Sequence, residues 1–193
     1  MAYLKKYNWI FYYSYWLYSI LYLLLLSRFL PSILTNSFHL TASEIGLMFI
    51  PMSLSIMLGS YCYKLLQKLL TTKQALFITS FFNIICVTLF SFTYSINIPF
   101  IIIVTSLYGF SMGLSMPTHT TLLTEEFVQE RATAIGMYNF IRYFGMSTGP
   151  LVGGFLLFNQ NYFWIFFLGA IMFLIIILYA MKMLRFPATQ KVK

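Results

Sequence analysis

The sequence contains no aspartate, and acidic residues of any kind are rare. Four glutamates are the only carboxylate side chains among 193 residues, and charged residues make up 8% of the chain. An enzyme active site would need His, Asp, Glu, Ser or Cys side chains clustered at one depth, and so few groups do not provide such a cluster. The two cysteines lack a metal-ligand spacing. We therefore expect neither an enzyme nor a metal or cofactor site.

What the chain has in abundance is apolar side chains. Hydrophobic residues make up 60% of the sequence, and the mean hydropathy is +0.82. A membrane-spanning helix takes roughly 20 predominantly apolar residues. The sequence offers six such segments, joined by short polar connections that leave no room for a soluble domain. We predict an all-α integral membrane protein with one domain over residues 1–193 and helices at about 9–30, 44–63, 74–95, 99–121, 134–158 and 161–181.

Basic residues indicate how these helices cross the membrane. The connections around residues 31–43, 95–98 and 159–160 carry no Lys or Arg. Ten basic residues all fall on the other side: Lys5, Lys6, Lys64, Lys68, Lys73, Arg131, Lys182, Arg185, Lys191 and Lys193. Because cytoplasmic loops carry the excess of Lys and Arg, both termini are predicted to be cytoplasmic, in the cell membrane. This bias also explains the net charge of +8, so we do not expect nucleic-acid binding.

An internal repeat appears when each residue is compared with the residue 90 positions later. Residues 41–48, TASEIGLM, then fall over residues 131–138, RATAIGMY, with three identities. Gly59 falls over Gly149. Ninety residues correspond to three predicted helices, and an odd number of helices makes the second set enter from the opposite side. The repeat therefore predicts a 3+3 arrangement with inverted topology.

The segment 136–154, GMYNFIRYFGMSTGPLVGG, combines an apolar helix-length sequence with many helix-weakening residues. These residues are Gly136, Gly145, Gly149, Pro150, Gly153 and Gly154. A glycine costs a soluble helix about 1 kcal/mol relative to alanine, and an interior proline costs about 3 kcal/mol. In a membrane, small residues allow helix backbones to approach closely, and proline bends a helix. We predict a tightly packed, bent helix here, and a second packing stripe that includes Gly109 and Gly113.

The same segment matches G-x8-G-x3-G-P-x2-G-G, the signature of helix 5 and its counterpart helix 11 in drug-proton antiporters of the major facilitator superfamily. The preceding residues 116–136, MPTHTTLLTEEFVQERATAIG, also resemble that family. The resemblance implies efflux of a small, drug-like or metabolite substrate in exchange for protons, by two six-helix halves around a cavity. The chain lacks the family's Asp-containing loop after Gly59 and an Arg within helix 4, so it resembles the carboxyl-terminal half.

The resemblance implies that a second six-helix half, or a second copy of this chain, completes the transporter within the lipid bilayer. An alternative is a non-transporting remnant or an assembly subunit of a membrane complex. An adjacent reading frame encoding six more helices would favour a split transporter. Drug-like cations suit the family, whereas an intramembrane arginine better suits an anion or a zwitterion.

Three polar residues are candidates for substrate binding or gating. Arg142 lies eight residues past Ala134, about 12 Å into the membrane, on the side of the helix that carries Gly149. With Asn139 it could bind an anion, a carbonyl group or the partner half, and equally it could anchor a neighbouring helix. His119, near the cytoplasmic end of its helix, is a candidate proton carrier.

Overall fold

The computed structural model describes residues 29–156 and 162–183, and all of their secondary structure is helical. Residues 29–38 form a first helical segment. Five longer helices follow within the described residues: α2 (Ala42–Leu69), α3 (Thr72–Thr93), α4 (Ile98–Glu126), α5 (Arg131–Leu156) and α6 (Tyr162–Met183). The predicted all-helical class is confirmed.

Capping boxes define where α2 and α3 begin. At α2, the backbone N–H of Thr41 donates to Glu44 Oε2 at 2.8 Å, and the N–H of Glu44 donates back to Thr41 Oγ1 at 3.4 Å. Thr71 and Gln74 form the same reciprocal pair at α3. Such pairs satisfy backbone donors that have no partner inside the helix. His39, with φ of 54°, reverses the chain between residues 29–38 and α2.

Several helices are longer than the apolar segments predicted. Residues 31–38, expected to be a connection, are helical, and residues 9–28 of the first predicted span lie outside the described residues. The helix predicted to end at 63 continues to Leu69, so Lys64 and Lys68 are helical. Likewise, α4 extends past the predicted end at 121 to Glu126. Apolar length measures the membrane interior, whereas a helix continues into the headgroup zone until its backbone is capped.

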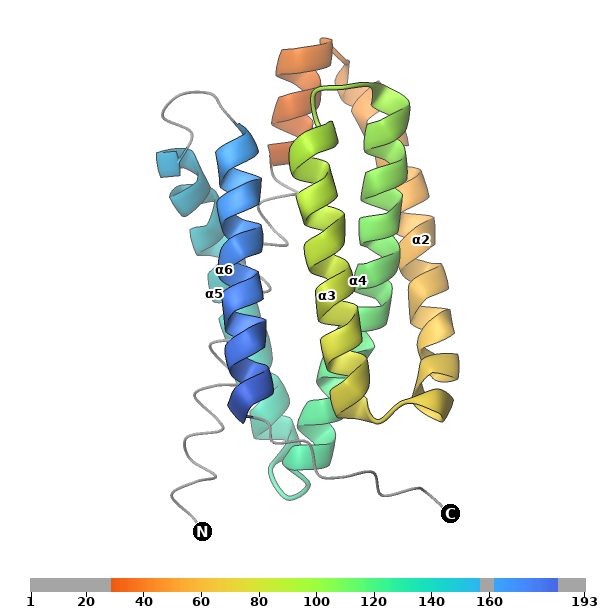
Figure 1. Ribbon diagram of the computed structural model, residues 1–193, viewed down its shortest axis with the longest axis vertical. Helices are drawn as coiled ribbons and strands as arrows, with labels where there is room; N and C mark the ends of the chain where they lie inside the picture. The colour runs from red at the N-terminus through yellow and green to blue at the C-terminus, as the bar shows by residue number, and fades with distance from the viewer. Residues whose placement is uncertain (1–28, 157–161, 184–193) are drawn as a thin grey trace.

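The helices alternate in direction, so that α2 and α4 run parallel (Figure 1). The central helix α4 packs against α2, α3 and α5, while α3 also packs against α6. One hydrophobic cluster joins residues 29–38 to α2, α3, α4 and α6, with Val87 and Phe166 fully buried in it. A second hydrophobic cluster lies nearer the start of α3 and joins α3, α4, α5 and α6.

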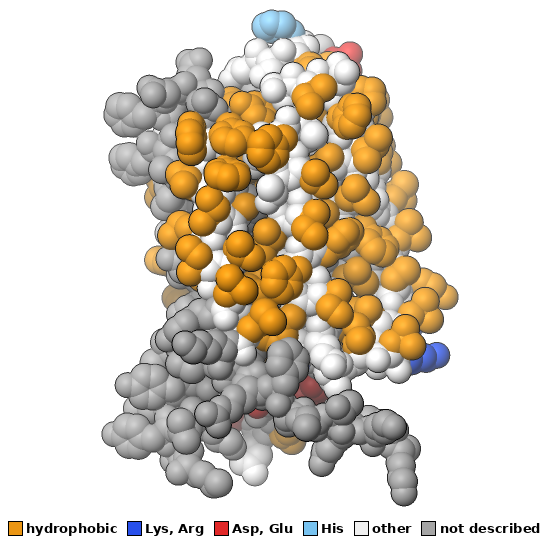
Figure 2. All heavy atoms as spheres, in the orientation of Figure 1, with side chains coloured by type: hydrophobic (Ala, Val, Ile, Leu, Met, Phe, Trp, Pro, Cys, Tyr) orange, Lys and Arg blue, Asp and Glu red, His pale blue; other side chains and the backbone are white. Residues whose placement is uncertain are grey.

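The surface of the bundle suits a lipid environment. Apolar side chains cover the middle of the face in Figure 2, with His at one end, basic atoms at the other end and acidic atoms at both ends. Among the described helices, α2, α3 and α4 are long and apolar enough to cross a membrane, and α6 is apolar from Tyr162 to Leu178. We call the end that carries Lys73 the basic end and the opposite end the His39 end.

The starts of two helices agree approximately with the spacing of the predicted repeat. α2 begins at Ala42 and α5 begins at Arg131, 89 residues later. The inverted relation of two three-helix sets, and the count of six spans, stay predictions.

Candidate functional site

Three glycines bring the backbones of α2 and α4 into direct contact. Gly59 lies on α2, and Gly109 and Gly113 lie four residues apart on α4. A Cβ atom on Gly59 would meet the carbonyl oxygen of Phe110 and would lie 3.1 Å from the Gly113 Cα. A Cβ atom on Gly113 would lie 2.9 Å from the backbone nitrogen of Ser60. No larger side chain fits there, as is typical of small residues four apart in membrane helices.

The glycine motif of α5 is distributed over two faces of the helix. Gly136 and Gly154 are exposed, and no neighbouring atom lies within 4 Å of where their Cβ atoms would be. Gly145, in contrast, is buried. At about 100° per residue, Gly154 returns to the face of Gly136, whereas Gly145 lies half a turn around the helix. The motif glycines therefore do not all lie on one face of α5.

Less is described for the remaining residues of the motif. α5 is continuous as a helix through this region. The packing around three of the motif residues lies outside what the structure describes: Gly149, Pro150 and Gly153. The bend that proline introduces therefore stays a prediction.

Arg142 lies near the middle of α5. It follows Arg131, the first residue of this helix of 26 residues, by eleven positions, or about 16 Å along the axis. Arg142 and Asn139 are both half-buried. The buried Tyr138 side chain lies close enough to Arg142 to interact with its charge. The ion pair in the described segments joins Lys73 to Glu126, so no described carboxylate neutralises the Arg142 guanidinium.

His119 lies on a buried polar ridge of α4. Its Nε2 atom is 3.1 Å from Ser115 Oγ, and both residues are buried. Ser111, one turn earlier, is also buried and donates to the backbone carbonyl of Thr79 on α3 at 3.4 Å. The three predicted polar residues thus fall on two helices, with Asn139 and Arg142 one turn apart on α5 and His119 on α4.

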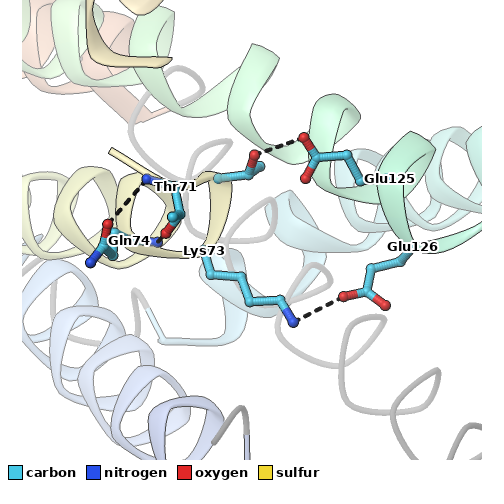
Figure 3. A network of polar contacts seen from close by, with 6 residues as sticks. Thr71, Lys73, Gln74, Glu125 and Glu126 are labelled. Atoms are coloured by element: carbon cyan, nitrogen blue, oxygen red, sulfur yellow. Dashed lines mark hydrogen bonds and ion pairs between the residues drawn. The ribbon is translucent and has the colours of Figure 1, made fainter. Parts of the chain in front are cut away.

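At the basic end, polar contacts fasten the first turn of α3 to the last turn of α4 (Figure 3). Lys73 Nζ lies 3.0 Å from Glu126 Oε1, and Thr72 Oγ1 donates to Glu125 Oε1 at 2.9 Å. The sequence placed these two glutamates in a loop before the next helix, but they are the last two residues of α4. Carboxylates are unfavourable at a helix carboxyl terminus, and the contacts with α3 offset this cost.

We expect this fastening to contribute little to stability. Both charged side chains are partly exposed, and such ion pairs contribute about 0–1 kcal/mol. Lys73→Met should lower the free energy of unfolding by no more than about 1 kcal/mol. Glu126→Gln should lower the free energy of unfolding by less than Lys73→Met does, because it also removes a negative charge that is unfavourable at the carboxyl terminus of α4. Denaturant titrations of the purified protein at low and high salt would measure both. A loss above 2 kcal/mol that persists at high salt would contradict this view.

Two residues at the helix contacts were not among the predicted site residues. Gly59 matched Gly149 in the repeat, and this correspondence with a motif glycine was the available signal for its packing role. Asn83 is a buried amide in the middle of α3. A lone amide within an apolar segment marks a polar contact inside a membrane protein. Across the described residues, no three His, Cys, Asp or Glu side chains gather closely enough to hold a metal.

Long apolar helices packed through glycines, with polar side chains buried between them and an apolar outer surface, define a polytopic helical membrane protein. The family model described as Major Facilitator Superfamily matches residues 8–193. The chain therefore belongs to this superfamily of membrane transporters. Curated proteins gave no match to the sequence.

Proposed function

We propose that the chain is one six-helix half, or a truncated form, of a secondary transporter that exports a small drug-like molecule or metabolite across the cell membrane. The observation that carries the proposal is the superfamily match, which extends over residues 8–193. The glycine motif of α5 supports the antiporter subtype, because every defined position of the signature is present. In this proposal the basic end and both termini face the cytoplasm.

Two apolar stripes support a partner bundle. On α2 and α5, exposed side chains recur at the repeat spacing of 90 residues. The α2 stripe consists of Leu47, Ile50, Leu54 and Tyr61, and the α5 stripe consists of Met137, Phe140, Phe144 and Leu151. Gly46 and Gly136 lie beside these stripes, and both are exposed with open space around them. We propose that the stripes face a second six-helix half or a second copy of this chain.

Proton coupling, if it operates, needs a carboxylate from that partner. The four glutamates of this chain lie at helix ends or in a connection: Glu44, Glu125, Glu126 and Glu130. None lies at mid-membrane depth, where proton relays of transporters operate. We propose His119, a buried titratable residue of α4, as an auxiliary proton carrier.

Arg142 is proposed to bind the substrate or the partner half. An arginine at the membrane centre costs roughly 3 kcal/mol on insertion scales, so its retention indicates a role. We expect Arg142→Gln to lower the transport rate at least about tenfold, the effect of losing one charged hydrogen bond. Arg142→Lys should restore only part of the rate, because an ammonium lacks the planar fork of a guanidinium.

The control for Arg142 is Arg131→Gln, on the same helix but exposed at its first residue. This variant should keep the rate within about twofold, since surface charges contribute little. Quantitative blotting of membranes would confirm equal amounts of each variant. Equal rates for Arg142→Gln and the parent chain would instead assign Arg142 a purely structural role.

The proposed function is tested by export of ethidium, a lipophilic cation, and of a fluorescent anion such as carboxyfluorescein. Inverted vesicles that contain the chain, with and without a candidate partner and with and without a pH gradient, would be compared with vesicles lacking it. Cysteines introduced at Ile50 and Phe140 would report self-association by crosslinking. A chain that crosslinks to nothing and moves neither probe would favour the non-transporting remnant or assembly subunit.

A further inference from the structure

Two polar atoms between α3 and α4 have no hydrogen-bond partner in the described part of the chain. They are the amide oxygen Oδ1 of Asn83 and the phenol oxygen of Tyr108. Asn83 is 7% exposed and Tyr108 is 2% exposed. One group is an acceptor, and the other is both a donor and an acceptor.

A shared acceptor on α3 places Asn83 near Ser111 of α4. The carbonyl oxygen of Thr79 accepts from Asn83 Nδ2 at 3.0 Å and from Ser111 Oγ at 3.4 Å. Asn83 Nδ2 and Ser111 Oγ are therefore at most 6.4 Å apart, which is the sum of their two distances to this oxygen. Ser111 follows Tyr108 by three residues, which places them on neighbouring parts of one helix face. Cys86, one turn after Asn83 on α3, lies near Tyr108.

Asn83 and Tyr108 lie close to the middle of the membrane. Asn83 lies eleven residues from the start of α3 and Tyr108 ten residues from the start of α4, or about 15–17 Å along each helix. The hydrocarbon core is roughly 30 Å thick, so water from either surface does not reach this depth freely. A buried polar group without a partner loses its hydrogen bonds to water and gains none in return, so leaving it unsatisfied is costly. Two such groups at one level form a polar site that a small ligand can satisfy.

We propose that the α3–α4 interface holds one internal water molecule, bound between Tyr108 and Asn83. Tyr108 donates its hydroxyl hydrogen to the water, and the water donates one of its hydrogens to Asn83 Oδ1. A buried water typically makes two to four hydrogen bonds to groups that would otherwise lack partners. The Ser111 hydroxyl provides a further oxygen near the amide. This hydration site is independent of the identity of the transported molecule.

A double-mutant cycle tests whether Tyr108 and Asn83 share a ligand, by comparing the stability of two single variants with that of the double variant. With the water bound, Tyr108→Phe and Asn83→Leu should each raise the unfolding equilibrium constant about fivefold or more, because each removes one anchor of the water. Together they should cost clearly less than the product of the two single effects. The Asn83 bond to Thr79 is lost in both backgrounds and cancels in the cycle. Reversible denaturation in mixed micelles gives these constants.

The control cycle pairs Tyr108→Phe with Ser91→Ala. Ser91 is equally buried on α3, but its hydroxyl donates to Val87 O of its own helix, so these two effects should multiply. If Tyr108→Phe and Asn83→Leu each leave the protein as stable or more stable, and their effects simply multiply, the two polar atoms share no ligand and the proposal is overturned.

Radiolytic hydroxyl labelling of the unmutated protein provides a second test that needs no folded variant. X-rays convert bound water into hydroxyl radicals, which oxidise the side chains beside it. Tyr108 should be oxidised despite its burial, whereas Phe90, which is 1% exposed and packs against Phe166 of α6, should not. Tyr108 and Phe90 labelled equally, or neither labelled, would exclude an internal water at this site.

Discussion

Replacing Gly113 with leucine should strongly destabilise the folded protein. The added side chain would have to occupy space already taken by backbone atoms of α2, including the nitrogen of Ser60 and the Cα atom of Gly59. Backbone atoms inside two packed helices cannot rotate away as a side chain can. Overpacking in a core costs typically 1–3 kcal/mol, and here we expect about 3 kcal/mol or more. That is over a hundredfold in the unfolding constant.

The measurement is the folded fraction after extraction into mild detergent, followed by denaturant titration. Gly136→Leu is the matched control, because this glycine also lies within a helix but has open space around it. It should be neutral or should raise stability by up to about 1 kcal/mol, through better helix propensity. If Gly113→Leu and Gly136→Leu behave alike, α2 and α4 do not meet at these glycines.

Truncating Phe166 to alanine is expected to have the second-largest effect, by loosening α6 from α3. The Phe166 ring packs edge-on against Phe90, with ring centroids 4.9 Å apart and an interplanar angle of 81°. Phe166 has no exposed surface, and Phe90 is 1% exposed. A Phe to Ala change in such a core costs about 3–5 kcal/mol, part of which is the cavity left behind. In lipid the loss is mainly of dispersion contacts, so we expect about 3 kcal/mol.

Phe100→Ala serves as the control for this change, because Phe100 is an exposed side chain near the start of α4. Its removal should change the free energy of unfolding by less than about 0.5 kcal/mol. Thermal unfolding followed by circular dichroism, in the same detergent for all three proteins, would rank them. Similar melting temperatures for Phe166→Ala and Phe100→Ala would contradict the described packing of α6.

The helices themselves were predictable because membrane solvent imposes a simple rule on sequence. Apolar segments of about 20 residues identify α2, α3 and α4 as helices and locate the start of each within two residues. The far ends were less predictable, since Lys68 and Glu126 are polar residues that remain helical beyond the apolar segment. The Thr-x-x-Glu and Thr-x-x-Gln patterns at Thr41 and Thr71 would have located two starts to the residue.

The candidate site was predictable only in part. The depth of Arg142 follows from counting along one helix, and the structure places it in the middle of α5. Which glycines meet another helix depends on how faces of different helices pair, and a single sequence does not specify this pairing. The prediction therefore centred on the motif of α5, although Gly59 and Gly113 are the described glycines packed most tightly against a neighbouring helix. The alignment of Gly59 with Gly149 in the internal repeat was therefore a better guide to this contact than the number of glycines in the α5 motif.

The glycine contact between parallel helices also sets an order of events during biosynthesis. Gly59 of α2 has its partner on α4, and α3 must cross the bilayer in the opposite direction before α4 can enter beside α2 (Figure 1). In a nascent chain that has not reached Gly113, Gly59 consequently has no packing partner on α4. Until α4 has been inserted, this face of α2 stays open to the surrounding membrane.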